Sequence, residues 1–519
     1  MTRRGAPRTR RGAPRTRRGA SPPFRRSSLA FGSLLPASPQ DRIARAKPAL
    51  GHLLFALVCL VVIGGTLGGF LVGRWSARRA DRVGALLAAE QSVLTLDQMV
   101  VDGIDDPLTS AALAKLYDVP AGDRRALRER LRRVVWGPPY RPAPFVGHMA
   151  RPHLEGEPRI NLLGFRDARD TYGTKPPRRL RIFLTGGSAA WGSGASSDAT
   201  TLGARLEDRL NERVSPLSGH RYEVVNTAFP AWSTTQEKIL IQQRLVDLHP
   251  DVVLMFSGNN DVHWMVNGRD IRWAYTYMDQ NYLAILSELH RSRGHPEAAL
   301  ALPFASRPIE CATVGHLAAR NVEEAAAAAA RAGARLIFAL QPNLMSTAKG
   351  RSARERRLLE TLDTARWAAC YGALREHLGG LRAPNYRFVD LSRLFGGLDA
   401  DTELYVDSYH VADLGNRLLA QGLAEAIDWP SIAPGAAVSA PDAEPLRILR
   451  VDPRASTLRV VPNRVTPNLV LVLDGAVLPT LVEAGSLSAA AAPLRAEHTV
   501  AVADGITGEM SAPVVVRHR

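Results

Sequence analysis

RIFLTGGSAAWGSG (residues 181–194) is the stretch that decides the predicted fold. RIFLT is a short apolar run typical of a buried strand, and the glycine-rich turn after it leads toward a helix. Ser188 stands in that turn. A nucleophilic serine needs small neighbours that let a carbonyl group approach, and the N–H groups of a helix N-terminus can stabilise an oxyanion. A phosphate-binding or purely structural turn would look similar, so the stretch alone assigns no function.

The same alternation continues along the chain to about residue 427. Short apolar runs predict buried strands, and the longer amphipathic segments between them predict helices. Such a pattern is typical of a parallel sheet covered on both faces, with right-handed crossovers. We therefore expect a three-layered α/β domain. The predicted strands are residues 181–185, 222–226, 251–256, 334–340 and 386–391, and the predicted helices are 202–214, 234–248, 319–333 and 412–427.

Two further motifs carry chemistry. SGNND (257–261) follows the third predicted strand, at the sheet edge where open α/β sheets bind ligands. Asn260 there either donates a hydrogen bond to a developing negative charge or only shapes a turn. In DSYH (407–410), Asp407 can hold the Nδ1–H of His410 while Nε2 takes a serine proton. The alternative is that Asp407 caps a helix and His410 is a surface residue.

Together these motifs resemble the SGNH/GDSL hydrolase family. In that family a GDS or GGS motif follows the first strand, a glycine-rich block the second and GxND the third, and DxxH comes near the end. The resemblance covers roughly residues 160–428, including NLLGFR (161–166), which is similar to the lead-in of membrane-linked members. It implies a flavodoxin-like α/β/α fold. The matching residues are GGS (186–188), NTAFPAWS (226–233), GNND (258–261) and DSYH (407–410).

The resemblance also implies a role for each residue. Ser188 would be the nucleophile, His410 the general base and Asp407 the residue that orients the base. The oxyanion hole would comprise the backbone N–H groups of Ser188 and Ala231 and the side chain of Asn260. No cofactor is expected, and no spacing of Cys and His predicts a metal site.

Two departures from the family pattern bear on this site. Gly187 replaces the Asp of GDS, which is not a triad position. Ala228 and Ala231 stand where the second block commonly has glycine. A backbone N–H survives a change from glycine to alanine only if the position does not need a positive φ, so the contact from Ala231 depends on the backbone there.

Several functions fit these motifs. An esterase and an O-acyltransferase share the acyl-enzyme and differ in whether water or an acceptor hydroxyl attacks it. The expected substrate is an ester, such as an O-acylated glycan or lipid, and the acceptor for a transferase would be a cell-envelope polysaccharide. A catalytically silent binding scaffold is a third reading, against which the intact triad argues. An α/β-hydrolase is disfavoured, because its elbow is G-x-S-x-G whereas residues 186–190 are GGSAA.

The first 47 residues differ in composition from the rest. They carry thirteen Lys or Arg and one acid, a charge of +12 out of the chain's +16, so nucleic-acid binding by the folded part is not expected. TRRGAPR occurs at 2–8 and again at 9–15. With few apolar residues, this segment is predicted to be a disordered cytoplasmic tail or the product of a misassigned start codon. Binding to anionic lipid or nucleic acid is the alternative.

An apolar stretch free of Asp, Glu, Lys and Arg follows at 48–73. Its length predicts a retained transmembrane helix rather than a signal peptide. Thirteen basic residues precede it and four follow within ten residues, so the N-terminus should be cytoplasmic and the catalytic part periplasmic or extracellular. In an oxidising compartment Cys311 and Cys370 could form a disulfide, and two free buried thiols are the alternative.

Two segments interrupt or precede the α/β domain, which is expected to span 161–429. Residues 74–160 are predicted to be a helical juxtamembrane region that holds the catalytic part away from the bilayer, with a proline-rich linker at 137–144. Residues 263–308 break the alternation and are rich in aromatic residues and Arg, which predicts either a lid or a structural insertion.

The end of the chain has a different pattern. A linker rich in Pro and Ala is predicted at 430–444. Short apolar runs separated by turns follow at 445–519, which predicts a small β-sandwich with an accessory binding or packing role. Nothing in the sequence indicates an oligomeric state.

Overall fold

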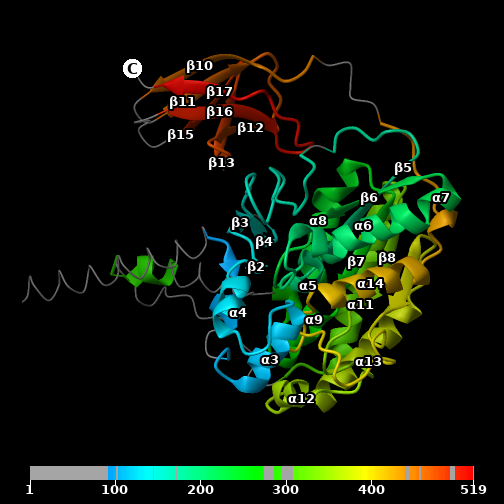
Figure 1. The fold of residues 1–519 in the computed structure, drawn as a ribbon. Coiled ribbons are helices and arrows are strands. Elements are labelled where there is room, and N and C mark those ends of the chain that lie inside the picture. The colour runs from blue at the N-terminus through cyan, green and yellow to red at the C-terminus, as the bar shows by residue number, and fades with distance from the viewer. Residues whose placement is uncertain are drawn as a thin grey trace, which may run out of the picture. The chain divides into compact units, whose positions relative to one another are not determined.

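The computed structural model describes residues 92–517 except 101–102, 144, 171, 274–285, 292, 295–307, 439–443, 455–456 and 491–496 (Figure 1). The predicted tail (1–47) and the predicted membrane span (48–73) lie outside the described residues, as does much of the predicted insertion. Within the described residues, no helix has the length and apolar character needed to cross a bilayer.

A five-stranded parallel sheet forms the centre of the fold (Figure 1). Its strand order is β6-β5-β7-β8-β9, and every neighbouring pair is parallel. In order of sequence this is the flavodoxin-like arrangement, as predicted. Nearly all side chains of β5 and β7 are buried, because the sheet is covered on both faces. The strands are β5 (Arg179–Gly186), β6 (Arg221–Asn226), β7 (Val252–Ser257), β8 (Arg335–Leu340) and β9 (Tyr386–Asp390).

Helices cover the sheet in two groups. Helix α6 (Leu202–Arg213) packs against α14 (Asp413–Ala426), and in the second group α11 contacts α8, α9 and α13. The buried side chains of α6 recur at helical spacing, as expected for an amphipathic helix over a sheet. The other helices are α5 (Ser188–Trp191), α7 (Ser215–Ser218), α8 (Thr234–Gln243), α9 (Asn259–Val266), α11 (Cys311–Arg331), α12 (Ala353–Leu359), α13 (Thr364–Gly380) and the 3-10 turns η1 (Asp198–Thr200), η2 (Leu245–Leu248), η3 (Ile271–Trp273) and η5 (Trp429–Ser431).

A disulfide links two helices of the second group. Cys311 is the first residue of α11 and Cys370 lies in α13, with their Cα atoms 4.5 Å apart. Of the two possibilities left open by the sequence, the structure has the bridge. It joins positions 59 residues apart, so it restricts a long loop in the unfolded chain.

The segment before the sheet differs from the predicted spacer. Helices α2 (Leu96–Val100), α3 (Pro107–Leu116) and α4 (Arg124–Leu131) lie between strands β1 (Leu94–Thr95) and β2 (Val135–Gly137), which pair with each other. Their apolar side chains share one core with Val406 and Ala412 of the α/β region. The expectation that this region holds the catalytic part at a distance is therefore wrong for these elements, because their apolar faces are buried against it.

The proline-rich stretch at 137–144 is likewise not a free linker. It contains strand β3 (Tyr140–Ala143), which forms an antiparallel hairpin with β4 (Gly147–Ala150). Pro142 is tolerated because an edge strand does not need every N–H in the ladder.

The described part of the predicted 430–444 linker also lies against the α/β region. The backbone N–H of Gly435 donates to Oδ1 of Asp251, and Val438 forms an isolated antiparallel bridge with Lys175. Lys175 and Asp251 themselves form a buried ion pair, with 2.7 Å between Nζ and Oδ1.

After residue 444 the chain forms two antiparallel sheets of four strands each, with orders β10-β11-β15-β14 and β13-β12-β16-β17. Leu458 and Leu487 of the first sheet share a core with Leu471 and Val502 of the second, which agrees with the predicted β-sandwich. The strands are β10 (Ile448–Arg454), β11 (Thr457–Pro462), β12 (Leu469–Leu473), β13 (Ala476–Leu478), β14 (Thr480–Glu483), β15 (Ser486–Ala490), β16 (Glu497–Asp504) and β17 (Val514–Arg517).

Candidate active site

Ser188 is the first residue of α5, directly beyond the end of β5. Gly186 makes this turn possible: its φ is 150°, and a Cβ there would lie 2.3 Å from the carbonyl oxygen of Phe256 on β7. The side chain of Ser188 is half-buried. Its backbone N–H donates to no group among the described residues, as is usual at the first turn of a helix.

The three residues predicted to form a triad lie together. Nε2 of His410 is 2.6 Å from Oγ of Ser188, although the two residues are 222 positions apart in sequence. Nδ1 of His410 is 2.7 Å from Oδ2 of Asp407. The other carboxylate oxygen of Asp407 accepts the backbone N–H groups of Tyr409 and His410, each at 2.8 Å. The DSYH turn therefore folds back on itself as its spacing predicts.

The protonation state of Asp407 sets the direction of these hydrogen bonds. Burial acts to raise its pKa, but the charge of His410 and the hydrogen bonds from His410 and Tyr409 outweigh burial and hold the pKa below its ordinary value. At neutral pH Asp407 is therefore a carboxylate that accepts the Nδ1–H of His410. Nε2 is then the acceptor for the hydroxyl proton of Ser188, which is the arrangement a general base requires.

Three donors predicted for an oxyanion hole lie near the same turn. Nδ2 of Asn260 donates to the carbonyl oxygen of Trp232 at 2.7 Å, which fixes the amide and leaves its second N–H. A Cβ placed on Gly187 would lie 2.3 Å from this Nδ2, so the amide lies against the backbone that leads to Ser188. The backbone N–H of Ala231 has no acceptor among the described residues.

The condition expected for Ala231, that its position should not need a positive φ, is not met in the structure. The φ of Ala231 is +70°, in the left-handed region that glycine adopts without cost, and this costs alanine roughly 1–2 kcal/mol. The conformation is held because the carbonyl oxygen of Ala231 accepts the indole N–H of Trp264 at 3.1 Å. Alanine therefore presents its N–H here as glycine would.

The same packing accounts for the glycine at position 187. The Cβ of any larger residue would meet Nδ2 of Asn260 and lie 3.2 Å from the carbonyl oxygen of Trp232. An Asp at this position, as in GDS, would require Asn260 to move. This site is built around glycine.

Trp136 is a neighbour of His410 that the sequence did not reveal. The two ring centroids are 4.5 Å apart, and the rings meet edge to face at 67°. Trp136 lies on β2, and we refer to residues 92–137 as the N-terminal brace. Residues of this brace lie far from the triad in sequence and belong to no recognisable motif, so the sequence did not indicate their contact with His410.

The N-terminal brace also holds the turn that follows Ser188. The backbone N–H of Gly194 donates to the carbonyl oxygen of Val135 at 3.1 Å, and Oγ of Ser193 donates to that of Trp136 at 2.6 Å. The buried hydroxyl of Tyr117 donates to the carbonyl oxygen of Gly194 at 2.8 Å. The brace thus links the turn that begins at Ser188 to the segment that carries Asp407 and His410.

Two further aromatic rings lie near His410. The ring of Tyr409 is 6.1 Å from that of His410 and 5.8 Å from that of His263. Burial, and then the positive charges of Arg269 and His410, lower the pKa of His263 to about 4. His263 is therefore neutral at pH 7 and adds no charge beside the base.

A buried acid lies under the turns of Ser188 and Asn260. Glu237 of α8 bonds to the hydroxyl of Thr185 at 2.7 Å and to that of Ser257 at 2.6 Å, so it bridges the ends of β5 and β7. Burial raises its pKa to about 8, although both hydrogen bonds act to lower it. Glu237 is therefore mainly protonated at pH 7 and serves as a neutral bridge.

Comparisons with known proteins add the following. No family model matches the chain, and no curated protein matches it. Similar solved structures include a lipase from a goat rumen metagenome, with 12% identity, a TM-score of 0.29 and coverage of 48% of this chain and 97% of that one. A lipase/acylhydrolase from Enterococcus faecalis has 16% identity, a TM-score of 0.30 and coverage of 47% and 94%.

A further similar structure is a catalytic mutant of an acetylxylan esterase from Geobacillus stearothermophilus, with 15% identity, a TM-score of 0.27 and coverage of 48% and 94%. The α/β fold itself is shown by the strand order and by the parallel pairing of the five strands.

Replacing Trp136 with Ala is expected to lower kcat about 10- to 100-fold with little change in KM, because a loosened His410 is poorly aligned with Ser188. Trp136→Phe keeps an aromatic edge and should retain most of the activity. Leu108→Ala, on the partly exposed face of α3 in the same brace, is the matched control. A purely structural role for Trp136 would instead lower the melting temperature and affect Phe and Ala variants alike.

Replacing Glu237 with Gln should change how stability depends on pH. The folded protein keeps the Glu237 proton to about pH 8, whereas the unfolded chain releases it near 4.5. Between these values the folded state binds more protons, so raising the pH favours unfolding, by up to about 1.4 kcal/mol per pH unit. Urea unfolding from pH 5 to 8 should show a smaller decline for Glu237→Gln than for the wild type. Equal slopes would mean that Glu237 is not protonated in the folded protein.

Proposed function

We propose that this chain is a serine hydrolase of the SGNH type that cleaves carboxylic esters through an acyl-enzyme on Ser188. The observation that carries the proposal is the hydrogen-bonded series from Ser188 Oγ to His410 Nε2 and from His410 Nδ1 to Asp407 Oδ2. A structural turn or a helix cap would not require all three side chains to align.

The geometry supports the following sequence of steps. As Oγ of Ser188 attacks the ester carbonyl carbon, Nε2 of His410 takes the hydroxyl proton and Asp407 stabilises the resulting imidazolium. The tetrahedral intermediate collapses, the imidazolium gives its proton to the leaving alkoxide, and the acyl group remains on Ser188. Water then attacks the acyl-enzyme by the same route and releases the acid.

The negative charge of the tetrahedral oxygen would be met by the backbone N–H groups of Ser188 and Ala231 and by Nδ2 of Asn260. The backbone N–H groups of Ser188 and Ala231 have no acceptor among the described residues. The side chain of Asn260 donates one N–H to Trp232 and keeps its second N–H. Such prealigned donors stabilise the transition state more than the ground state, because the oxygen is fully charged only there. An O-acylated glycan or lipid is the proposed ester substrate.

Ser188→Ala should abolish turnover of p-nitrophenyl acetate and labelling by a fluorophosphonate probe, because it removes the nucleophile. Asn260→Ala should still be labelled, with turnover about 10²–10³ slower, the usual cost of one oxyanion donor. Asp407→Asn should fall between the two, because His410 is then wrongly oriented or protonated.

Steady-state kinetics and gel labelling of the same preparations measure both effects, with circular dichroism to confirm folding. Ser431→Ala is the matched control, since it removes an exposed hydroxyl of η5 that donates to the backbone carbonyl of Asp428, outside the site. A folded Ser188→Ala protein with wild-type turnover would contradict the proposal and favour a binding scaffold.

We also propose that the catalytic region lies outside the cytoplasm, on the far side of a membrane spanned by residues 48–73. The excess of basic residues before that stretch supports this orientation. The bridge between Cys311 and Cys370 also supports it, because disulfides persist in oxidising compartments.

The orientation can be measured with reporters fused after residue 100. Alkaline phosphatase, which needs an oxidising compartment, should be active there, and green fluorescent protein exported through the same route should be dark. The opposite pattern would place the catalytic region in the cytoplasm.

A further inference from the structure

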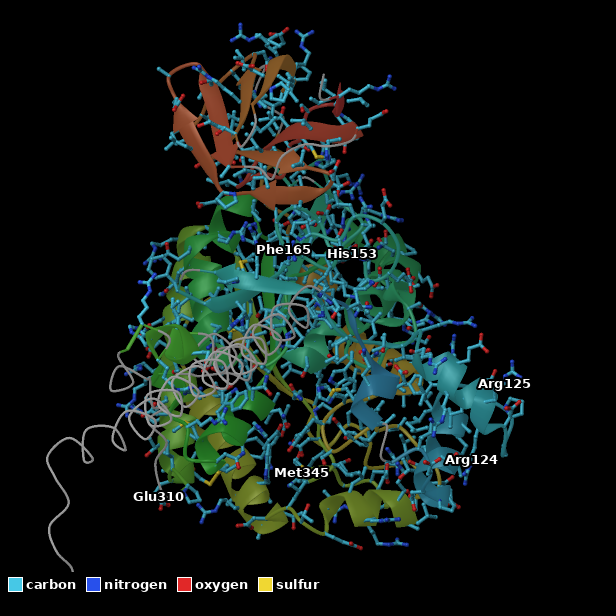
Figure 2. All side chains as sticks on the ribbon, turned by 90° about the vertical axis from the view of Figure 1, so that its left-hand side faces the viewer. Arg124, Arg125, His153, Phe165, Glu310 and Met345 are labelled. Atoms are coloured by element: carbon cyan, nitrogen blue, oxygen red, sulfur yellow. A yellow bond between two sulfur atoms is a disulfide. The ribbon has the colours of Figure 1, made fainter. Side chains whose placement is uncertain are left out.

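A cavity of about 380 Å³ is lined by none of the candidate active-site residues. It is bordered by the β3–β4 hairpin, the end of α8 and side chains of the C-terminal sheets, including Val470 and Val477. Its volume is within the range of ~300–1,000 Å³ typical of small-molecule sites. Phe165, labelled in Figure 2, lies near this cavity, because the guanidinium of Arg244, which lines the cavity, is 5.8 Å from the centroid of the Phe165 ring.

The charged side chains of this cavity are all positive. Arg141 and Arg244 line it, and no Asp or Glu does. No carboxylate of the described residues forms an ion pair with Arg141, Arg244 or the adjacent Arg151. The guanidinium of Arg244 donates only to Sδ of Met149 and to the carbonyl oxygens of Leu163 and Gly505, each at 3.3 Å.

The side chain of Arg141 has fewer hydrogen-bond partners among the described residues than that of Arg244. Its Nε is buried and has no hydrogen-bond partner among the residues that the structure describes. Arg141 stands opposite Met149 in the hairpin register, so it lies next to the sulfur that contacts Arg244. Burial and the charge of Arg151 lower the pKa of Arg141, and burial and the charge of Arg141 lower that of Arg244 to about 10. Both shifts are in the direction that an unpaired cluster of cations produces.

Unpaired cations in a partly buried site are costly, and proteins usually pair them with an acid. Here no acid of the described residues serves that purpose, so an external anion would relieve the repulsion. Arginine is suited to this, because its planar N–H groups match the oxygens of a phosphate or carboxylate.

The rest of the cavity lining is mainly apolar. Met149, Ile239, Leu240 and Val477 contribute to it, and Phe145, at the tip of the hairpin, has 85% of its surface exposed. Phe145 thus extends the apolar lining of the cavity to the protein surface. A free inorganic anion would leave these apolar walls in contact with water, whereas an anion attached to an alkyl chain would cover them.

We propose that this cavity binds an anionic lipid, with the phosphate group held by Arg141 and Arg244 and part of an acyl chain lying against Phe145, Ile239 and Val477. The site is distinct from the ester-cleaving site. Arg244 follows the last residue of α8, whereas Ala231 and Ser233 precede its first, so about 15 Å of helix separates the two ends. The proposal does not depend on the proposed activity.

The test uses the full-length chain in a neutral maltoside detergent, titrated by calorimetry with dioctanoyl phosphatidylglycerol. Saturable binding of one lipid is expected. Arg141→Gln and Arg244→Gln should each weaken it about tenfold or more, since each removes a charge-assisted pair. Phe145→Ser, at an exposed position, should weaken it several-fold without affecting folding. Arg133→Gln, which removes an exposed arginine that is paired with Glu129, is the matched control and should bind as the wild type does.

Three companion ligands separate the possible sources of binding. Dioctanoyl phosphatidylcholine has the same chains and no net charge, and it should bind at least tenfold more weakly. Inorganic phosphate and octanoate should show no saturable binding at the same concentrations. Equal binding of the phosphatidylcholine, full occupancy by phosphate alone, or binding unaffected by both arginine changes would each overturn the proposal. Circular dichroism of every variant verifies folding, so this result is independent of the activity experiments.

Discussion

The parallel pairing of β5 with both β6 and β7 is the constraint on which the rest of the site depends. Because these three strands run in one direction, their carboxyl ends meet at one edge of the sheet, and the turns that follow them are brought together. Ser188, Ala231 and Asn260 each lie just beyond one of these ends. Gly186 and Glu237 maintain this edge, the first by its close approach to Phe256 and the second by bonding to the ends of β5 and β7.

His410 and Asp407 come from a part of the chain far from Ser188 in sequence, so a second element has to position them. The N-terminal brace does this by packing on Val406 and Ala412, which flank the DSYH turn, while bonding to Ser193 and Gly194 beyond the nucleophile. The ring of Trp136 packs edge to face against the ring of His410. The N-terminal brace, which was expected to be part of a spacer, thus belongs to the site. It fixes the turn that begins at Ser188 relative to the turn that carries Asp407 and His410.

The sequence predicted those features that depend on local pattern. Apolar runs and amphipathic segments predicted the strands and helices, and the resemblance to the SGNH/GDSL family implied their flavodoxin-like order. The spacing of Asp407 and His410 allowed their hydrogen bond but left a helix cap as the alternative, and the structure has the hydrogen bond. Trp136, Glu237 and the Arg141–Arg244 cavity could not be foreseen, because each acquires its meaning from residues far away in sequence. Ala231 was predicted only in part. The sequence indicated that its contact depends on φ, but the value of φ and the contact with Trp264 are seen only in the structure.

The central claim is that Ser188 carries the acyl group, and the most direct measurement is to trap that intermediate. The full-length protein would be mixed with a p-nitrophenyl ester, quenched in acid within the first turnovers and digested for mass spectrometry. The account predicts an acyl adduct on the peptide that contains Ser188, and none in Ser188→Ala. Turnover with no adduct on that peptide, or an adduct on another residue that persists in Ser188→Ala, would contradict it.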